Sequence, residues 1–147
     1  MKSLNIRLFA VFLLLFPLAG FAQSKPSQDQ QTLMVFGDSL SAAYGIEEEQ
    51  GWVNLLQAKL SQEQYDFRVI NASVSGETST GGLARLPAML DTHQPDLVIL
   101  ELGGNDGLRG LPLNTLKTNL QEMIALIQAS GARILLAGIQ IPPNYGP

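Results

Sequence analysis

Short apolar runs alternate with helical patterns along the chain from Thr32 onward. Four runs have the length and apolar content of buried strands, at residues 32–36, 67–70, 97–102 and 133–138. Between them, apolar residues recur every three or four positions, which is typical of helices that pack on a sheet. This alternation predicts a parallel sheet built from βαβ units.

Three stretches have the apolar spacing of a helix that faces the sheet. The first follows residues 42–50, whose three glutamates suit the start of a helix, and its apolar face is Trp52, Leu55, Leu56 and Leu60. The second face is Leu83, Leu86 and Leu90, and Pro87 is expected to kink or restart that helix. The third is expected to begin near Asn114 as its cap and to end before Gly131, with the face Leu113, Leu116, Leu120, Met123 and Ile127.

The segment before the first strand has the pattern of a secretory signal. Lys2 and Arg7 precede the apolar run 8–18, and small residues at 20 and 22 suit a signal peptidase. A membrane span needs roughly 20 apolar residues, so an uncleaved anchor is the less favoured alternative. We therefore expect a signal peptide at 1–22, a polar tail at 23–31 and one domain at 32–147, exported to a bacterial periplasm or the medium.

Composition excludes several kinds of chemistry. The 147 residues include no cysteine and one histidine, His93, which excludes disulfides, thiolate sites and zinc sites built from several imidazoles. The formal net charge is −4, and loss of Lys2 and Arg7 with the signal makes the mature chain more acidic. An acidic chain without a basic run is a poor candidate for binding nucleic acid.

Three polar, glycine-containing loops follow the first three predicted strands. They carry Ser39, Gly76 and Asn105, and the carboxyl ends of parallel strands meet at one edge of a sheet. Considered alone, Asp38 and Ser39 suit a helix cap as well as a nucleophile turn. Acyl transfer needs a nucleophile beside hydrogen-bond donors for the oxyanion. Ser39 N–H, Gly76 N–H and the Asn105 side-chain amide are the candidate donors.

The three loops also resemble the conserved blocks of a known family. Gly-Asp-Ser-Leu at 37–40, Gly76, and Gly-Gly-Asn-Asp at 103–106 resemble the first three blocks of the SGNH (GDSL) hydrolases, in the same order. The resemblance covers about residues 32–147 and is greatest to the bacterial periplasmic group of acyl-CoA thioesterases, lysophospholipases and arylesterases. It implies a flavodoxin-like three-layer α/β/α sandwich, Ser39 as nucleophile, and an oxyanion hole formed by Ser39, Gly76 and Asn105.

The chain departs from the family pattern at one block. The family's Asp-x-x-His segment, which supplies the Asp and His of the triad, is missing, so a C-terminal truncation is expected. His93 precedes the third strand whereas Ser39 follows the first, so we expect His93 in a surface loop roughly 15–20 Å from Ser39. The 147 residues alone are expected to be poorly soluble or inactive, with an exposed fourth strand. Asp38 and Asp106 are expected to fix loops.

The expected function is that of a secreted serine esterase or thioesterase acting on small acyl substrates, without metal or organic cofactor. Leu108 and Leu111 are either a mobile apolar wall for the acyl chain or part of a static loop. A carbohydrate O-acetylesterase and a non-catalytic binding module stay open as alternatives. A nucleotide-binding domain is disfavoured because no Gly-x-Gly-x-x-Gly follows the first strand. The candidate substrate contacts are Asp38, Leu40, Gly104, Leu108 and Leu111.

Overall fold

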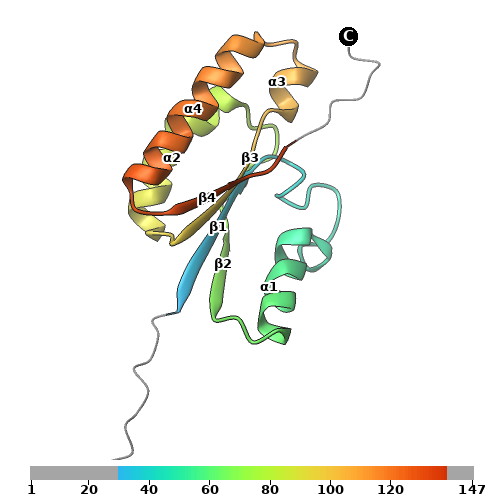
Figure 1. Cartoon of the computed structure of the whole chain (residues 1–147). Helices are drawn as coiled ribbons and strands as arrows, with labels where there is room; N and C mark the ends of the chain where they lie inside the picture. The colour runs from blue at the N-terminus through green and yellow to red at the C-terminus, as the bar shows by residue number, and fades with distance from the viewer. Residues whose placement is uncertain (1–29, 139–147) are drawn as a thin grey trace, which may run out of the picture.

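The computed structural model, which describes residues 30–138, contains one parallel sheet of four strands (Figure 1). The strands are β1 (Gln31–Gly37), β2 (Phe67–Asn71), β3 (Leu97–Glu101) and β4 (Arg133–Leu136), in the order β2-β1-β3-β4. β1 pairs with both β2 and β3, and Gly37 lies opposite Glu101 at the carboxyl end. The predicted parallel sheet is confirmed, with β1 beginning inside the expected tail and β4 ending two residues early.

Helices cover both faces of the sheet, which gives the expected three-layer α/β/α sandwich (Figure 1). α1 (Trp52–Gln62) lies on one face, and α2 (Ser79–His93) and α4 (Leu113–Ala129) pack together on the other. A short helix, α3 (Gly104–Leu108), follows β3.

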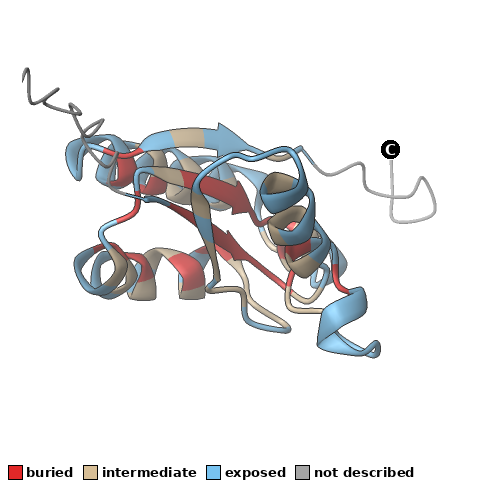
Figure 2. Ribbon diagram, turned by 90° about the horizontal axis from the view of Figure 1, so that it is seen from below, coloured by how far each residue is buried: buried red, intermediate tan, exposed pale blue. Residues whose placement is uncertain are grey.

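Alternate residues of β1 supply the two halves of the core, because successive side chains of a strand point to opposite faces. Met34 and Phe36 pack under α2 and α4, whereas Leu33 and Val35 pack under α1. The central strands are accordingly buried on both faces (Figure 2). Each fully buried large apolar side chain contributes about 1.5–3 kcal/mol. This core fixes β1, and therefore the loop that carries Ser39, in the middle of the sheet.

Two expectations about the region before and within α1 are wrong. Residues 42–50 form turns and a short 3-10 helix, η1 (Glu48–Gln50), rather than the start of a long helix. Ala43 and Gly45 both have positive φ angles there, which interrupt a helix. Trp52 and Leu55 are exposed, whereas Leu56 and Leu60 pack against the sheet as expected, next to the buried Val53.

The other two helical faces are largely confirmed. The predicted face of α2 packs in the core through Leu83, Leu86 and Leu90. The helix continues without interruption through the exposed Pro87. In α4, Leu120, Met123 and Ile127 contact the core as expected, and Ile124 contacts it as well. Leu113, by contrast, is 69% exposed. Asn114 is not the cap, because α4 begins at Leu113 directly after Pro112, whose fixed φ suits the start of a helix.

β4 is one of the two edge strands of the described sheet, and β2 is the other. Leu135 and Leu136 are exposed, because α1 does not reach over β4 and the α4 face is only partly covered there (Figure 2). The expected signal peptide at 1–22 lies outside the described residues, as do residues 139–147. Among the helices within 30–138, none combines the length and the apolar character that crossing a membrane requires.

Candidate active site

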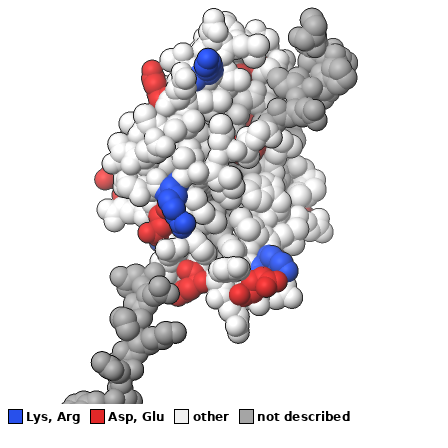
Figure 3. Space-filling model, in the orientation of Figure 1, with Lys and Arg blue, Asp and Glu red and all other residues white. Residues whose placement is uncertain are grey.

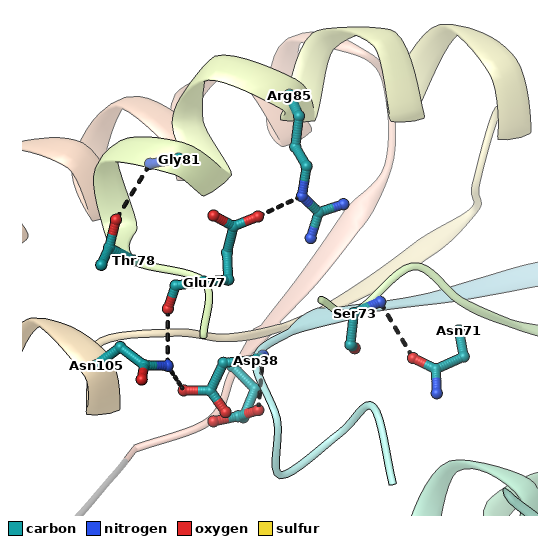
Figure 4. A network of polar contacts seen from close by, with 9 residues as sticks. Asp38, Asn71, Ser73, Glu77, Thr78, Gly81, Arg85 and Asn105 are labelled. Atoms are coloured by element: carbon teal, nitrogen blue, oxygen red, sulfur yellow. Dashed lines mark hydrogen bonds and ion pairs between the residues drawn. The ribbon is translucent and has the colours of Figure 1, made fainter. Parts of the chain in front are cut away.

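The loops that follow β1, β2 and β3 meet at the carboxyl edge of the sheet, as the sequence predicts. The clearest contact between them is made by the Asn105 side chain (Figure 4). Its Nδ2 donates to Asp38 Oδ2 at 3.1 Å and to the Glu77 carbonyl oxygen at 2.9 Å. Asn105 therefore contacts the residue before Ser39 and the residue after Gly76. One side chain joins all three loops.

Ser39 lies in a tight turn at the end of β1. The Asp38 carbonyl accepts hydrogen bonds from Ser41 N–H and Ala42 N–H, and Asp38 Oδ1 accepts a third from Leu40 N–H at 3.0 Å. Ser39 is partly exposed, and neither its N–H nor its hydroxyl has a hydrogen-bond partner within residues 30–138. This turn thus presents one hydroxyl and one backbone donor side by side.

Gly76 lies in a turn closed by a hydrogen bond from Glu77 N–H to the Val74 carbonyl. Its φ of +78° is in the left-handed region, where glycine carries no steric penalty. Its carbonyl accepts from the Arg109 guanidinium at 2.8 Å, and in the described chain its N–H donates to no acceptor. The peptide is held by its oxygen while its N–H stays free to bind a ligand.

The Asn105 amide differs from these two backbone donors. An amide NH2 has two hydrogens, and here Asp38 and Glu77 accept one each. An oxyanion can bind Asn105 only by sharing or replacing one of these two acceptors. Asn105 therefore lies beside the other two loops, as predicted, but both hydrogens of its amide already bind acceptors of the protein.

Glu77 and Arg85 support the Gly76 loop, although neither residue is among the site residues predicted from the sequence. Arg85 Nε donates to Glu77 Oε2 at 2.6 Å, and both side chains are largely buried. The Arg85 guanidinium also lies over the ring of Phe36, 4.0 Å from its centroid. This pair anchors the loop to α2 and β1 (Figure 4). Sequence patterns do not reveal it, because the partners are eight residues apart and Glu77 lies outside the helix that carries Arg85.

Asp106 fixes the third loop, as expected. Its two carboxylate oxygens accept from Ser79 N–H at 2.8 Å and from the Ser79 hydroxyl at 2.6 Å. Both residues are almost completely buried. Asp38 is also buried, and its oxygens bind Leu40 N–H and Asn105, so the expectation that both aspartates fix loops is confirmed.

The candidate substrate contacts differ in accessibility. Leu40 and Leu108 are exposed, Gly104 and Leu111 are partly buried, and Asp38 is only 2% exposed. Leu108 belongs to α3 rather than to a loop, because residues 104–108 form a helical turn. Asp38 thus has little surface left for a substrate, which favours its role in the loops.

His93 lies at the opposite edge of the sheet from Ser39. It is the last residue of α2, partly buried, and not in a surface loop as expected. It precedes the start of β3, which pairs with β1 from Leu33 up to Gly37. His93 is therefore not placed to accept a proton from Ser39.

The charged side chains next to these loops are held by partners: Arg109 binds the Gly76 carbonyl, and Arg85 binds Glu77. On the face shown in Figure 3, Lys and Arg side chains lie singly in a mostly uncharged surface. Within residues 30–138, no three His, Cys, Asp or Glu side chains are grouped so that they could hold a metal ion. Within residues 30–138, the groups of the three loops that keep a free donor include the Ser39 hydroxyl and the N–H groups of Ser39 and Gly76.

A parallel α/β/α sandwich with a serine turn, a glycine turn and an asparagine at one edge has the architecture of an SGNH hydrolase. The model of the GDSL-like lipase/acylhydrolase family matches residues 35–147, and the chain belongs to this family.

The chain is similar to enzymes of known name. It is 61% identical over 117 residues to esterase TesA of Pseudomonas aeruginosa, covering 80% of this chain and 58% of TesA. It is 47% identical over 115 residues to thioesterase 1/protease 1/lysophospholipase L1 of Escherichia coli K12, covering 78% of this chain and 54% of that protein. A crystal structure of TesA gives a TM-score of 0.78 at 61% identity, over 80% of this chain and 65% of that one. The chain thus spans somewhat more than half the length of these curated relatives.

Proposed function

We propose that a protein carrying this chain hydrolyses carboxylic esters or thioesters of acyl chains through an acyl-enzyme on Ser39. The observation that carries the proposal is the Asn105 amide, which joins the residues next to Ser39 and Gly76. Within residues 30–138, the Ser39 hydroxyl and the N–H groups of Ser39 and Gly76 have no hydrogen-bond partner, and all three groups belong to loops at the carboxyl edge of the sheet. The names of the similar proteins, an esterase and a thioesterase, support the same class of substrate.

In the proposed reaction, Ser39 Oγ attacks the acyl carbonyl carbon as its proton passes to a general base. The carbonyl oxygen becomes an oxyanion, which Ser39 N–H and Gly76 N–H stabilise as donors, each worth roughly 2.7–4 kcal/mol. The alcohol or thiol leaves with a proton, and water then attacks the acyl-enzyme to release the acid. Ser39 regains its proton in the last step.

Family resemblance implies that the base is a histidine from an Asp-x-x-His block, which these 147 residues do not contain. We therefore propose the activity for a protein that combines this chain with such a block. The chain as printed is proposed to be inactive, because His93 lies at the wrong edge of the sheet.

Asn105 is the proposed third oxyanion donor. Its Nδ2 is shared between Asp38 and Glu77, so the oxyanion must displace one of these acceptors or share a hydrogen with it. We propose Leu40, Leu108 and Leu111 as the apolar contacts of the acyl chain, with the backbone of Gly104 beside them.

A fluorophosphonate probe tests this function, because it forms a stable bond only with an activated serine. In the protein that carries the Asp-x-x-His block, we expect labelling at Ser39, located by peptide mass spectrometry. Ser39→Ala should abolish labelling and turnover of p-nitrophenyl esters. Ser61→Ala, which removes an exposed hydroxyl of α1, is the matched control and should leave both unchanged.

The result also separates the alternatives. A folded protein that carries the block but is not labelled at Ser39 would contradict the proposed hydrolase and leave a binding module. Turnover of acetylated sugars in preference to p-nitrophenyl esters of longer acyl chains would instead indicate a carbohydrate O-acetylesterase.

We also propose that residues 1–22 direct export and are removed afterwards. Lys2, Arg7 and the apolar run 8–18 support this proposal. Intact mass of the protein from a periplasmic fraction should correspond to a chain that begins at Gln23. A mass that retains residues 1–22 would contradict cleavage.

A further inference from the structure

Glu101 is a buried carboxyl group directly beneath the turn that carries Ser39. It ends β3, opposite Gly37 of β1, and is only 7% exposed. It has no part in the proposed reaction. Moving a carboxylate out of water is costly unless hydrogen bonds compensate, so its partners indicate what it does.

Glu101 Oε2 holds the turn on both sides of Ser39. It accepts a hydrogen bond from the Ser41 hydroxyl at 2.7 Å and a longer one from Asp38 N–H at 3.4 Å. One acceptor thus binds the residue before Ser39 and the second residue after it. The turn is also closed by its own bonds from Ser41 N–H and Ala42 N–H to the Asp38 carbonyl.

The neighbouring strand braces the same turn from the other side. Asn71, the last residue of β2, donates from Nδ2 to the Ser41 carbonyl at 2.8 Å. Ser41 is 1% exposed, with its hydroxyl tied to β3 and its carbonyl tied to β2. The nucleophile turn is therefore fixed to both strands that flank β1.

Gly37 leaves the room that this contact needs. A Cβ at residue 37 would lie 2.7 Å from Glu101 Oε2 and 2.8 Å from the Ser41 hydroxyl. Any larger side chain at 37 would therefore displace the carboxyl group from the turn. The glycine of the Gly-Asp-Ser turn serves the close approach of Glu101 in addition to the turn itself.

We propose that Glu101 is a positioning residue that fixes the turn carrying Ser39, so that the Ser39 N–H and hydroxyl face the substrate together. The proposal deepens the proposed hydrolase function and rests on it. An ionised carboxylate suits this role because hydrogen bonds to a charged acceptor are about twice as strong as neutral ones.

The surroundings of Glu101 change the pH range in which its carboxyl group ionises. Burial raises the pKa of Glu101, and the nearby Asp38 carboxylate acts in the same direction, whereas the hydrogen bonds from Ser41 and Asp38 N–H lower it. Asp38 is the charged group that the carboxyl faces from the β1 side. On the β4 side, Ala137 and Gly138 follow the strand and carry no charge. The second oxygen, Oε1, is buried without a partner within residues 30–138.

Amide hydrogen exchange in this chain, followed by NMR, tests the proposal directly. Glu101→Gln keeps the shape of the side chain but removes the charge, and we expect exchange at the hydrogen-bonded amides of residues 38 and 40–42 to rise at least tenfold relative to β1. Ser41→Ala removes the partner hydroxyl and should have a similar effect, and it serves as the test if Glu101→Gln fails to fold. Glu122→Gln makes the same chemical change at an exposed position of α4 and is the control.

A pH titration adds a readout that a purely structural role would not change. The amide signals of Asp38 and Leu40 should show an inflection above the usual glutamate range, and Glu101→Gln should lose it. An unchanged titration, or exchange at residues 38 and 40–42 within twofold of the parent, would overturn the proposal.

Labelling links the turn to the nucleophile. In the protein that carries the Asp-x-x-His block, we expect Glu101→Gln to slow fluorophosphonate labelling of Ser39 at least fivefold in the folded state. Equal labelling rates would overturn the positioning role. If the parent protein is not labelled at all, the hydrolase function fails, while the exchange and titration results still decide whether Glu101 fixes the turn.

Discussion

Asp106 lies directly after Asn105, and its carboxylate accepts two hydrogen bonds from the buried Ser79. Asp106→Ala removes both acceptors and leaves the Ser79 N–H without a partner in the protein interior. An unpaired buried donor costs about 1–3 kcal/mol, so we expect the free energy of unfolding to fall by that amount. Urea unfolding followed by circular dichroism measures the loss.

Asp106→Asn is the matched control for this prediction. Its amide keeps one oxygen acceptor at the same place, so it should lose less stability than Asp106→Ala. Equal losses in the two variants, or a loss below about 0.5 kcal/mol in Asp106→Ala, would show that the bonds to Ser79 do not hold this loop.

Glu101 is expected to make stability depend on pH. Burial raises its pKa in the folded protein, so the folded state binds more protons than the unfolded chain between the usual glutamate pKa and the raised one. The free energy of unfolding therefore falls as pH rises through that window. Below the window the contribution is fully present, and above it the contribution is lost.

Glu101→Gln does not titrate at this position, so the stability difference between parent and variant isolates the effect. We expect the parent to lose stability relative to Glu101→Gln as pH rises through the window, measured by urea unfolding at several pH values. A difference that stays constant with pH would contradict a raised pKa. A loss of stability with rising pH would fit the proposed role of Glu101, in which an ionised group serves the site at a cost in stability.

The three candidate site residues and their supports differ in how far the sequence predicts them. Ser39, Gly76 and Asn105 follow strands, and the rule that parallel strands share a carboxyl edge brings them together. Glu101 ends an apolar strand, and the sequence alone does not show that its carboxyl group reaches the Ser39 turn past Gly37, which lies opposite it. The state of Asn105, with both hydrogens already used, follows from two distances that no sequence pattern contains.

At the scale of elements, α2 approaches the sheet closely at Gly82. A Cβ there would lie 2.5 Å from Leu102 Cδ1 and 3.4 Å from the Phe36 ring. Overpacking of a core costs about 1–3 kcal/mol, whereas alanine gains about 1 kcal/mol over glycine in a helix. We therefore expect Gly82→Ala to lower the free energy of unfolding by up to about 2 kcal/mol in urea unfolding.

Ala84→Gly calibrates the helix term on the same element. Ala84 is exposed, so its replacement should cost only about 1 kcal/mol through helix propensity. If Gly82→Ala instead raised the free energy of unfolding by about 1 kcal/mol, Leu102 would move aside freely and the close approach would not limit packing.

Elements with a clear apolar period were predicted well, and those without one were not. The strands and the faces of α2 and α4 follow from spacing, because their inward residues enter the core. Trp52 and Leu55 fit a helical period equally well, yet α1 turns Val53 inward and leaves them exposed. Apolar periodicity identifies residues that share one side of a helix, but it does not determine how that helix is rotated relative to the sheet. α3 is too short to show a period, and its residues were expected to be a loop.

Across residues 30–138, the centre of the sheet is covered better than its β4 edge. β1 and β3 lie at the centre and are buried between helices, whereas β4 forms an edge of the described sheet. The site lies at the well-covered centre, since Ser39 follows β1 and Asn105 follows β3. Exposed apolar side chains occur both at the β4 edge, as Leu135 and Leu136, and beside the candidate site, as Leu40 and Leu108.

Leu135 of β4 is 55% exposed on the sheet edge, where unpaired backbone groups and apolar surface favour pairing with another chain. We expect Leu135→Lys to lower self-association of this chain, measured by light scattering against concentration, because a charge at an edge opposes strand pairing. Leu126→Lys adds the same charge at a 37% exposed position on α4, away from the edge, and should reduce self-association less. Both variants should keep the free energy of unfolding within about 0.5 kcal/mol of the parent. Equal reductions in the two variants would show that net charge, rather than the edge of β4, controls association.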